Sequence, residues 1–255
     1  MSRELEGQVA LVTGASRGVG YYMALELAKA GADIVVAARS EQVWDPKLPG
    51  TIYTAADDIR RLGQRVLPMK VDVAKDEEVD AAIKQTLSEF GRIDILVNNA
   101  GIMFPGNLVD VPIRRWDLIW KVNVRGLIYF SQQVLPVMIA QRRGTIINIS
   151  SRGADNSGAG NISYSVTKQA IRKFSEGLAG EVKVHDVKVF ALSPDGLVPS
   201  PGATYHGLDT RTPPERIEAT DVMGSAAVYL AARAPMDLSG QHFYSQTLLR
   251  DLAPA

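Results

Sequence analysis

The 255-residue sequence contains no cysteine, only three histidines and no excess of charge of either sign. The absence of cysteine excludes disulfides, thiolate catalysis, iron–sulfur ligation and cysteine-based zinc sites. Lysine plus arginine and aspartate plus glutamate number 28 each, so no overall field attracts nucleic acid or an anionic membrane. The histidines, His185, His206 and His242, lack metal-ligand spacing. We expect them at surface or loop positions, and we predict no metal site.

Long apolar runs are also missing. No stretch approaches the roughly 18 to 20 apolar residues that span a bilayer. Residues 1–7 are polar and lack the basic start, apolar stretch and cleavage site of a signal peptide. We therefore expect a cytoplasmic protein that does not bind membranes. The hydrophobic fraction of 46% and the length suit one globular domain over residues 1–255.

Short runs rich in valine and isoleucine alternate along the chain with longer segments of helical period. The expected strands lie at residues 9–12, 34–37, 66–71, 93–97, 146–149, 187–192 and 242–245. The expected helices lie at residues 19–30, 54–62, 76–90, 115–140, 163–182 and 219–232. Continuous apolar runs predict parallel strands buried on both faces, and their alternation with helices predicts βαβ units. The fold class is therefore α/β, with about seven strands and helices on both faces.

A glycine-rich turn, TGASRGVG at residues 13–20, follows the first strand and precedes a helix. Glycines in this position let backbone amides approach a pyrophosphate at the helix N-terminus. The same cluster also suits a tight strand-to-helix turn that binds nothing. Its place after the first strand favours a dinucleotide site.

The end of the second expected strand reads VAARS at residues 36–40 and contains no acid. An acid there would accept hydrogen bonds from the adenosine ribose of NAD and repel a 2′-phosphate. Arg39 can instead pair with phosphate through its planar donor fork, assisted by Arg17 from the glycine turn. Taken alone, Arg39 would be a solvated surface cation. Beside the glycine turn it favours NADP(H) over NAD(H).

Tyr164 and Lys168 stand four residues apart at the start of an expected helix, so their side chains share one face. A free tyrosine has a pKa near 10, and a neighbouring ammonium lowers that pKa. Ser151 ends the preceding strand, 13 residues upstream of Tyr164, where it could hydrogen-bond a reacting oxygen. Each feature alone has an ordinary explanation, such as a half-buried tyrosine beside a lysine or a serine at a strand end. Their combination indicates proton transfer by Tyr164.

Together these motifs resemble the short-chain dehydrogenase/reductase family of classical type, over almost the whole chain. The matching pieces are TGASRGVG, Asp72-Val73, the turn at residues 98–101, Asn123, Ser151, and Tyr164 with Lys168. The resemblance implies a single-domain, doubly wound Rossmann fold with a seven-stranded parallel sheet, and a catalytic tetrad of Asn123, Ser151, Tyr164 and Lys168. The residues expected to bind cofactor are Gly14, Ser16, Arg17, Gly18, Val19, Arg39, Ser40, Asp72, Val73, Asn99, Ala100, Gly101, Tyr164, Lys168, Pro194, Gly196 and Val198.

The resemblance also implies roles. Tyr164 would give its proton to a carbonyl oxygen as hydride arrives and take it back in the oxidative direction. Ser151 would orient that oxygen, Lys168 would lower the tyrosine pKa and hold the nicotinamide ribose, and Asn123 would anchor a proton-relaying water. The predicted function is an NADP(H)-dependent oxidoreductase of carbonyl reductase or alcohol dehydrogenase type, acting on a ketone, aldehyde or secondary alcohol. A non-enzymatic NADP(H) sensor is the alternative, although such proteins typically lose the catalytic tyrosine or lysine.

Three stretches depart from the family pattern. Residues 194–214 are rich in proline and predict a substrate-side lid, in which Asp195 resembles an insertion. Its side chain would either hydrogen-bond the nicotinamide carboxamide or face solvent. The loop at residues 41–54 is long and resembles a branch containing hydroxysteroid-dehydrogenase-like proteins, and we expect Trp44 and Tyr53 to pack it against the domain. Residues 242–246 differ from the usual family ending. In classical members this region packs in a tetramer, so the resemblance implies a homotetramer, and a dimer is the alternative.

Overall fold

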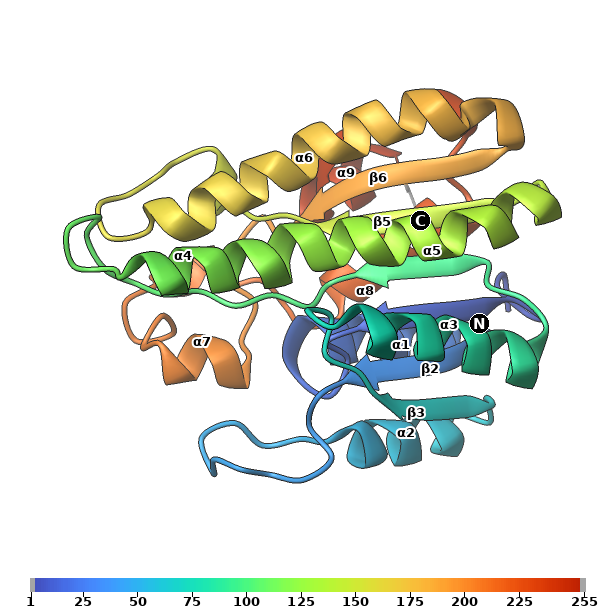
Figure 1. The fold of residues 1–255 in the computed structure, drawn as a ribbon, viewed down its shortest axis with the longest axis horizontal. Coiled ribbons are helices and arrows are strands. Elements are labelled where there is room, and N and C mark those ends of the chain that lie inside the picture. The colour runs from blue at the N-terminus through green and yellow to red at the C-terminus, as the bar shows by residue number, and fades with distance from the viewer. Residues whose placement is uncertain (1–2, 253–255) are drawn as a thin grey trace.

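A computed structural model describes residues 3–252 and confirms the predicted α/β fold class (Figure 1). One sheet of seven parallel strands has the order β3-β2-β1-β4-β5-β6-β7. The strands are β1 Val9–Thr13, β2 Asp33–Ala38, β3 Val66–Lys70, β4 Ile95–Asn98, β5 Gly144–Ile149, β6 Val187–Ser193 and β7 His242–Tyr244. The order reverses between β1 and β4, and ligands of doubly wound sheets bind outside the carboxyl ends of the strands at such a point.

Helices cover both faces of the sheet. They are α1 Gly18–Lys29, α2 Ile52–Arg61, α3 Asp76–Phe90, α4 Ile113–Trp120, α5 Gly126–Gln141, α6 Ile162–Val182, α7 Pro201–Tyr205, α8 Val222–Ala232 and α9 Ser245–Leu252. One hydrophobic core lies between the sheet and α1, α2 and α8, and the other lies between the sheet and α3, α5 and α6. Val12 points into the first core and Leu11 into the second. Burial on both faces is why residues 9–12 of β1 are all apolar. Within residues 3–252, no helix combines the length and apolar character needed to cross a bilayer.

Several predicted boundaries were wrong. The helix expected at residues 115–140 is α4 and α5, joined by a π-helical turn at Lys121–Arg125. Apolar period alone does not reveal such a widened turn, which often occurs at functional sites. The strand expected at residues 242–245 ends at Tyr244, because the buried Ser245 begins the unpredicted helix α9. The expected lid contains the short helix α7, whose first turn Ser200 caps by accepting from Ala203 N.

The long loop at residues 41–51 projects from the sheet edge beside α2 (Figure 1). Trp44 is 77% exposed, so the prediction that it packs the loop against the domain was wrong. Tyr53 is 48% exposed, and its hydroxyl donates to Glu41 at 3.2 Å, which links α2 to the start of the loop. The base of the loop is held by the glycine turn, since Arg17 donates to the Gly50 carbonyl at 2.8 Å. Gly50 has a φ of +101°, and a Cβ there would lie 2.6 Å from the Ser16 carbonyl oxygen. Glycine is required at this contact.

Candidate active site

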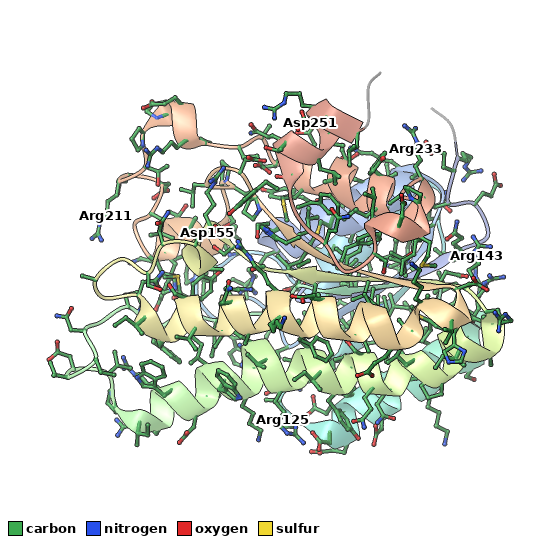
Figure 2. The ribbon with its side chains drawn as sticks, turned by 90° about the horizontal axis from the view of Figure 1, so that it is seen from above. Arg125, Arg143, Asp155, Arg211, Arg233 and Asp251 are labelled. Carbon is green, nitrogen blue, oxygen red and sulfur yellow. The ribbon has the colours of Figure 1, made fainter. Side chains whose placement is uncertain are left out.

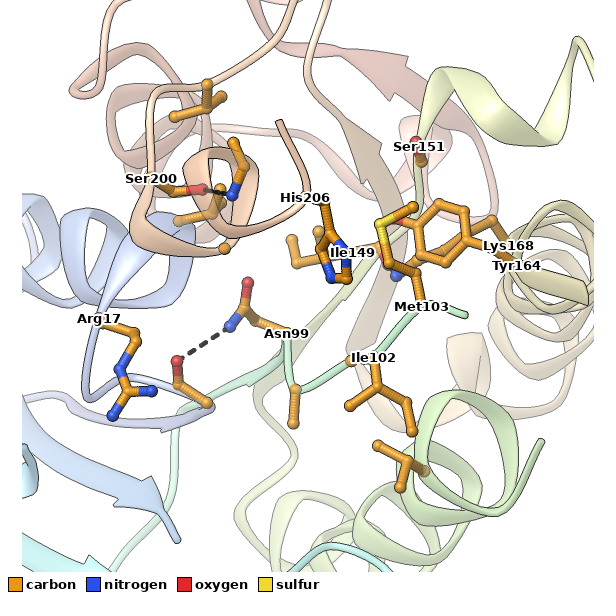
Figure 3. Close-up of a pocket in the computed structure, with 18 of the residues that line it drawn as sticks. Arg17, Asn99, Ile102, Met103, Ile149, Ser151, Tyr164, Lys168, Ser200 and His206 are labelled. Atoms are coloured by element: carbon orange, nitrogen blue, oxygen red, sulfur yellow. Dashed lines mark hydrogen bonds between the residues drawn. The ribbon is translucent and has the colours of Figure 1, made fainter. Parts of the chain in front are cut away.

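A cleft of about 570 Å³ crosses the carboxyl ends of the central strands (Figure 3). Nearly all residues expected to bind cofactor line it, namely Gly14, Ser16, Arg17, Val19, Arg39, Ser40, Asp72, Val73, Asn99, Ala100, Gly101, Tyr164, Lys168, Pro194, Gly196 and Val198. Ser151 lines it too. Gly18 and Asn123 do not line the cleft. A Cβ on Gly18 would lie 3.3 Å from the Ser200 Cβ.

The glycine turn is packed against the end of β4. A Cβ on Gly14, whose φ is +68°, would lie 2.9 Å from the Ala100 Cα. A Cβ on Gly20 would lie 2.3 Å from Asn99 Nδ2. Asn99 Nδ2 donates to the Thr13 carbonyl at 2.9 Å, which fixes the turn to β4. The close backbone approach at the start of α1 fits a pyrophosphate.

Two arginines occupy the outer end of the cleft. Arg17 Nη2 donates to Ser40 Oγ at 2.7 Å, and its Nε is buried without a partner. Arg39 is exposed at the end of β2. Over residues 3–252 neither arginine forms an ion pair with a carboxylate. Burial, and then the charge of Arg39, lower the pKa of Arg17. Two cations without a counter-charge fit an anion such as phosphate.

Tyr164, Lys168 and Ser151 meet at the inner end of the cleft (Figure 3). Lys168 is only 4% exposed, and its Nζ lies 5.4 Å from the centre of the Tyr164 ring. The Lys168 Nζ also donates to the Ile149 carbonyl at 2.8 Å. Ser151 Oγ accepts from Gly153 N at 3.1 Å and shares a hydrogen bond with Tyr164. The predicted spacing therefore brings these three side chains into one cluster.

The electrostatics of this cluster differ from the prediction. Burial raises the pKa of Tyr164, against the opposing effect of its hydrogen bond with Ser151. Burial also lowers the pKa of Lys168 to about 8. Burial therefore opposes the lowering of the tyrosine pKa that we expected from Lys168, and that role of Lys168 stays a prediction. Tyr164 thus keeps its proton at neutral pH.

Asn123 lies in the π-helical turn and is 1% exposed. Its Nδ2 donates to the Ile102 carbonyl at 2.9 Å and to Thr167 Oγ1 at 3.1 Å, and its Oδ1 accepts from Ile102 N at 2.8 Å. These bonds fix the chain after β4 against α6, beside Lys168. The predicted water relay at Asn123 stays a prediction.

Asp195 does not take either orientation that we expected. Its side chain is 14% exposed and Oδ2 accepts from the Gln246 and Thr247 amides at 2.7 and 3.1 Å. It also pairs with Arg152 at 3.1 Å. Asp195 therefore caps the first turn of α9, and it does not line the cleft although its neighbours Pro194 and Gly196 do.

Two histidines have positions that the sequence did not signal. His206 lies in a loop, as expected, but it lines the cleft and reaches from the lid toward Ile149 (Figure 3). His242 was expected at the surface or in a loop, whereas it is partly buried in β7, with Nε2 2.8 Å from Ser193 Oγ. Burial lowers the pKa of His242 to about 4. In the part of the chain that the structure describes, no three acidic or histidine side chains gather to hold a metal.

Comparison with known protein families identifies the family to which this chain belongs. The family model described as short chain dehydrogenase matches residues 8–204. The chain belongs to the short-chain dehydrogenase family. Dehydrogenases of this family interconvert CH–OH and C=O groups with a nicotinamide cofactor.

Similar proteins extend the match beyond those residues. The hydroxysteroid dehydrogenase-like protein 2 of Homo sapiens is 34% identical over 249 residues, which cover 97% of this chain and 58% of that protein. The chain therefore spans less than two thirds of the length of that relative. A gluconate 5-dehydrogenase from Burkholderia cenocepacia, solved with NADP and tartrate, shares 31% identity and a TM-score of 0.84 over 97% of both chains. A putative dehydrogenase from Xanthomonas campestris shares 30% identity and a TM-score of 0.88, over 99% of this chain and 92% of that chain.

Proposed function

We propose that the chain is an NADP(H)-dependent carbonyl reductase or alcohol dehydrogenase in which Tyr164 is the general acid and base. One observation carries this proposal: a single cleft has the Tyr164–Lys168–Ser151 cluster at one end and two unpaired arginines at the other. A ketone, aldehyde or secondary alcohol is the substrate class that such a cluster serves.

The cofactor preference follows from charge. Within residues 3–252, Arg17 and Arg39 form no ion pair, and β2 ends without the acid that would favour NAD. The gluconate 5-dehydrogenase from Burkholderia cenocepacia was solved with NADP, which agrees with this choice. The glycine turn would hold the pyrophosphate, Asp72 and Val73 the adenine, and Lys168 the nicotinamide ribose. When bound, the nicotinamide supplies or accepts the hydride.

Side chains of the protein transfer the proton. Tyr164 holds its proton at neutral pH, so its phenol can donate to a carbonyl oxygen during reduction. Ser151, which is hydrogen-bonded to Tyr164, orients and polarises that oxygen. Lys168 stabilises the phenolate that remains after transfer, because its buried Nζ lies 5.4 Å from the centre of the Tyr164 ring. In the alcohol-oxidising direction the phenolate takes the proton back.

The test is Tyr164→Phe. Turnover of a ketone, aldehyde or quinone, measured by NADPH absorbance, should fall by about two orders of magnitude or more, while NADPH binding changes less than about twofold. Tyr129→Phe is the matched control, because the Tyr129 hydroxyl binds Asp80 on the outer surface. Retained turnover in Tyr164→Phe would refute the assignment. Tight NADPH binding without turnover across the substrate panel would favour the non-enzymatic sensor. The homotetramer and the cytoplasmic location stay predictions.

A further inference from the structure

A buried guanidinium lies directly behind the catalytic cluster. Arg172 stands four residues after Lys168 and eight after Tyr164, so all three project from the same face of α6. The Arg172 side chain is 13% exposed. It does not line the cleft, and the mechanism above does not use it. Burial of a permanent charge is costly, which indicates that its partners matter.

One side of Arg172 holds the end of β5. Its Nε donates to Ser150 Oγ at 3.1 Å, and its Nη2 donates to the Ser151 carbonyl at 2.8 Å. Ser150 Oγ in turn donates to the Lys168 carbonyl at 2.9 Å. Arg172 is therefore bonded to the backbone of the proposed catalytic serine and, through Ser150, to the helix that carries the proposed catalytic lysine.

The other side of Arg172 is fixed by two further segments. Its Nη1 and Nη2 donate to the Asp155 carboxylate at 2.5 and 3.1 Å. Its Nη2 also approaches the Tyr244 hydroxyl of β7 at 3.3 Å, and that hydroxyl donates to Asp155. The guanidinium of Arg172, first through its hydrogen bond, holds the pKa of Asp155 at about 2. In Figure 2, Asp155 lies above α6, between that helix and the C-terminal segments.

These contacts restrain the backbone that carries Ser151 Oγ. Ser151 has extended backbone, with φ −165° and ψ 157°, and its hydroxyl both caps Gly153 N and meets Tyr164. Rotation of the peptide plane after Ser151 would displace the Gly153 amide that follows it, to which the Ser151 hydroxyl is hydrogen-bonded. The Arg172 bond to the Ser151 carbonyl holds that plane. A planar fork with several donors can bind these partners at once, whereas a single ammonium cannot.

We propose that Arg172 is a positioning residue for Ser151, and that it ties the geometry of the cluster to Asp155 and to Tyr244 of the C-terminal strand. This inference rests on the proposed function of Ser151 and Tyr164. Arg172 touches neither substrate nor cofactor in this proposal. Its loss should lower the rate of the chemical step and leave cofactor affinity unchanged, because the glycine turn and the two arginines lie at the far end of the cleft.

The experiment compares Arg172→Met with Lys173→Met, the exposed neighbour that pairs with Glu176. With menadione and NADPH, the kcat of Arg172→Met should fall about tenfold to a hundredfold, with less than about a twofold change in the NADPH dissociation constant. Lys173→Met should match the unchanged protein. Guanidinium ion added to Arg172→Ala at non-denaturing concentration should restore much of the rate.

A second readout does not need turnover. In protein carrying ¹³C-labelled tyrosine, the Tyr164 signal is the one missing from Tyr164→Phe. That signal should shift in Arg172→Met, because the Ser151–Tyr164 bond changes, and stay in place in Lys173→Met. If Arg172→Met does not fold, Arg172→Lys replaces it and should fold with reduced kcat.

The outcomes separate the two proposals. Full activity of Tyr164→Phe defeats the proposed function. If Tyr164→Phe is inactive but folded Arg172 variants keep the original kcat, or lose it without guanidinium rescue, the positioning role is wrong. An unmoved Tyr164 signal in folded Arg172→Met also overturns it, whether or not menadione is reduced.

Discussion

Replacement of Arg39 by alanine removes one of the two cations at the outer end of the cleft. A hydrogen bond to a charged group contributes about 1.5–3 kcal/mol, and solvent screening reduces this for an exposed side chain. Arg39 is exposed and Arg17 remains, so we expect a loss of about 1–2 kcal/mol, or roughly 5-fold to 30-fold weaker NADPH binding. NADH lacks the 2′-phosphate and should bind within about twofold of the original affinity.

Titration of cofactor fluorescence with purified protein measures both dissociation constants. Arg61→Ala is the matched control, because Arg61 is 74% exposed on α2 and lies outside the cleft. Added salt should weaken NADPH binding more in the original protein than in Arg39→Ala, since one charge pair is missing from the variant. Arg39→Asp should reverse the preference toward NADH. Equal weakening of both cofactors in Arg39→Ala would refute the reasoning and place the phosphate elsewhere.

Two further predictions concern stability. Asp195→Ala should lower the free energy of unfolding, measured in urea, by about 1–2 kcal/mol, as expected for loss of the α9 cap. Asp195→Asn should keep most of this stability, and the NADPH affinity of both variants should stay constant. Weakened cofactor binding with unchanged stability would contradict the capping role. The pKa of His242 is lowered from 6.5 to about 4, so the unfolded chain binds a proton first, and stability should fall as pH drops from 6.5 to 4. After a discount for partial exposure the loss is about 1–2 kcal/mol. His242→Gln should lack this part of the pH dependence, and an identical pH dependence in both proteins would count against it.

The sequence by itself determined the layers of the fold and the core of the site. Continuous apolar runs such as residues 9–12 in β1 predict strands buried on both faces, and helical segments between the strands favour parallel pairing. The glycine turn at residues 13–20 and the Tyr164–Lys168 spacing are local patterns, and the geometry of a turn and of one helix face follows from neighbouring residues alone. These expectations hold because strand, turn and helix geometry depend on short stretches of chain.

Only the tertiary structure decided the orientation of side chains whose partners are distant in the chain. Asp195 caps a helix that begins 50 residues later, and α9 itself was not predicted. Arg172 meets Tyr244 across 72 residues, and the pKa of Tyr164 is raised by burial that its immediate neighbours do not reveal. The sequence establishes which residues can reach the cleft. Desolvation and long-range hydrogen bonds depend on the whole packed chain, so they decide which of those residues are charged and where they point.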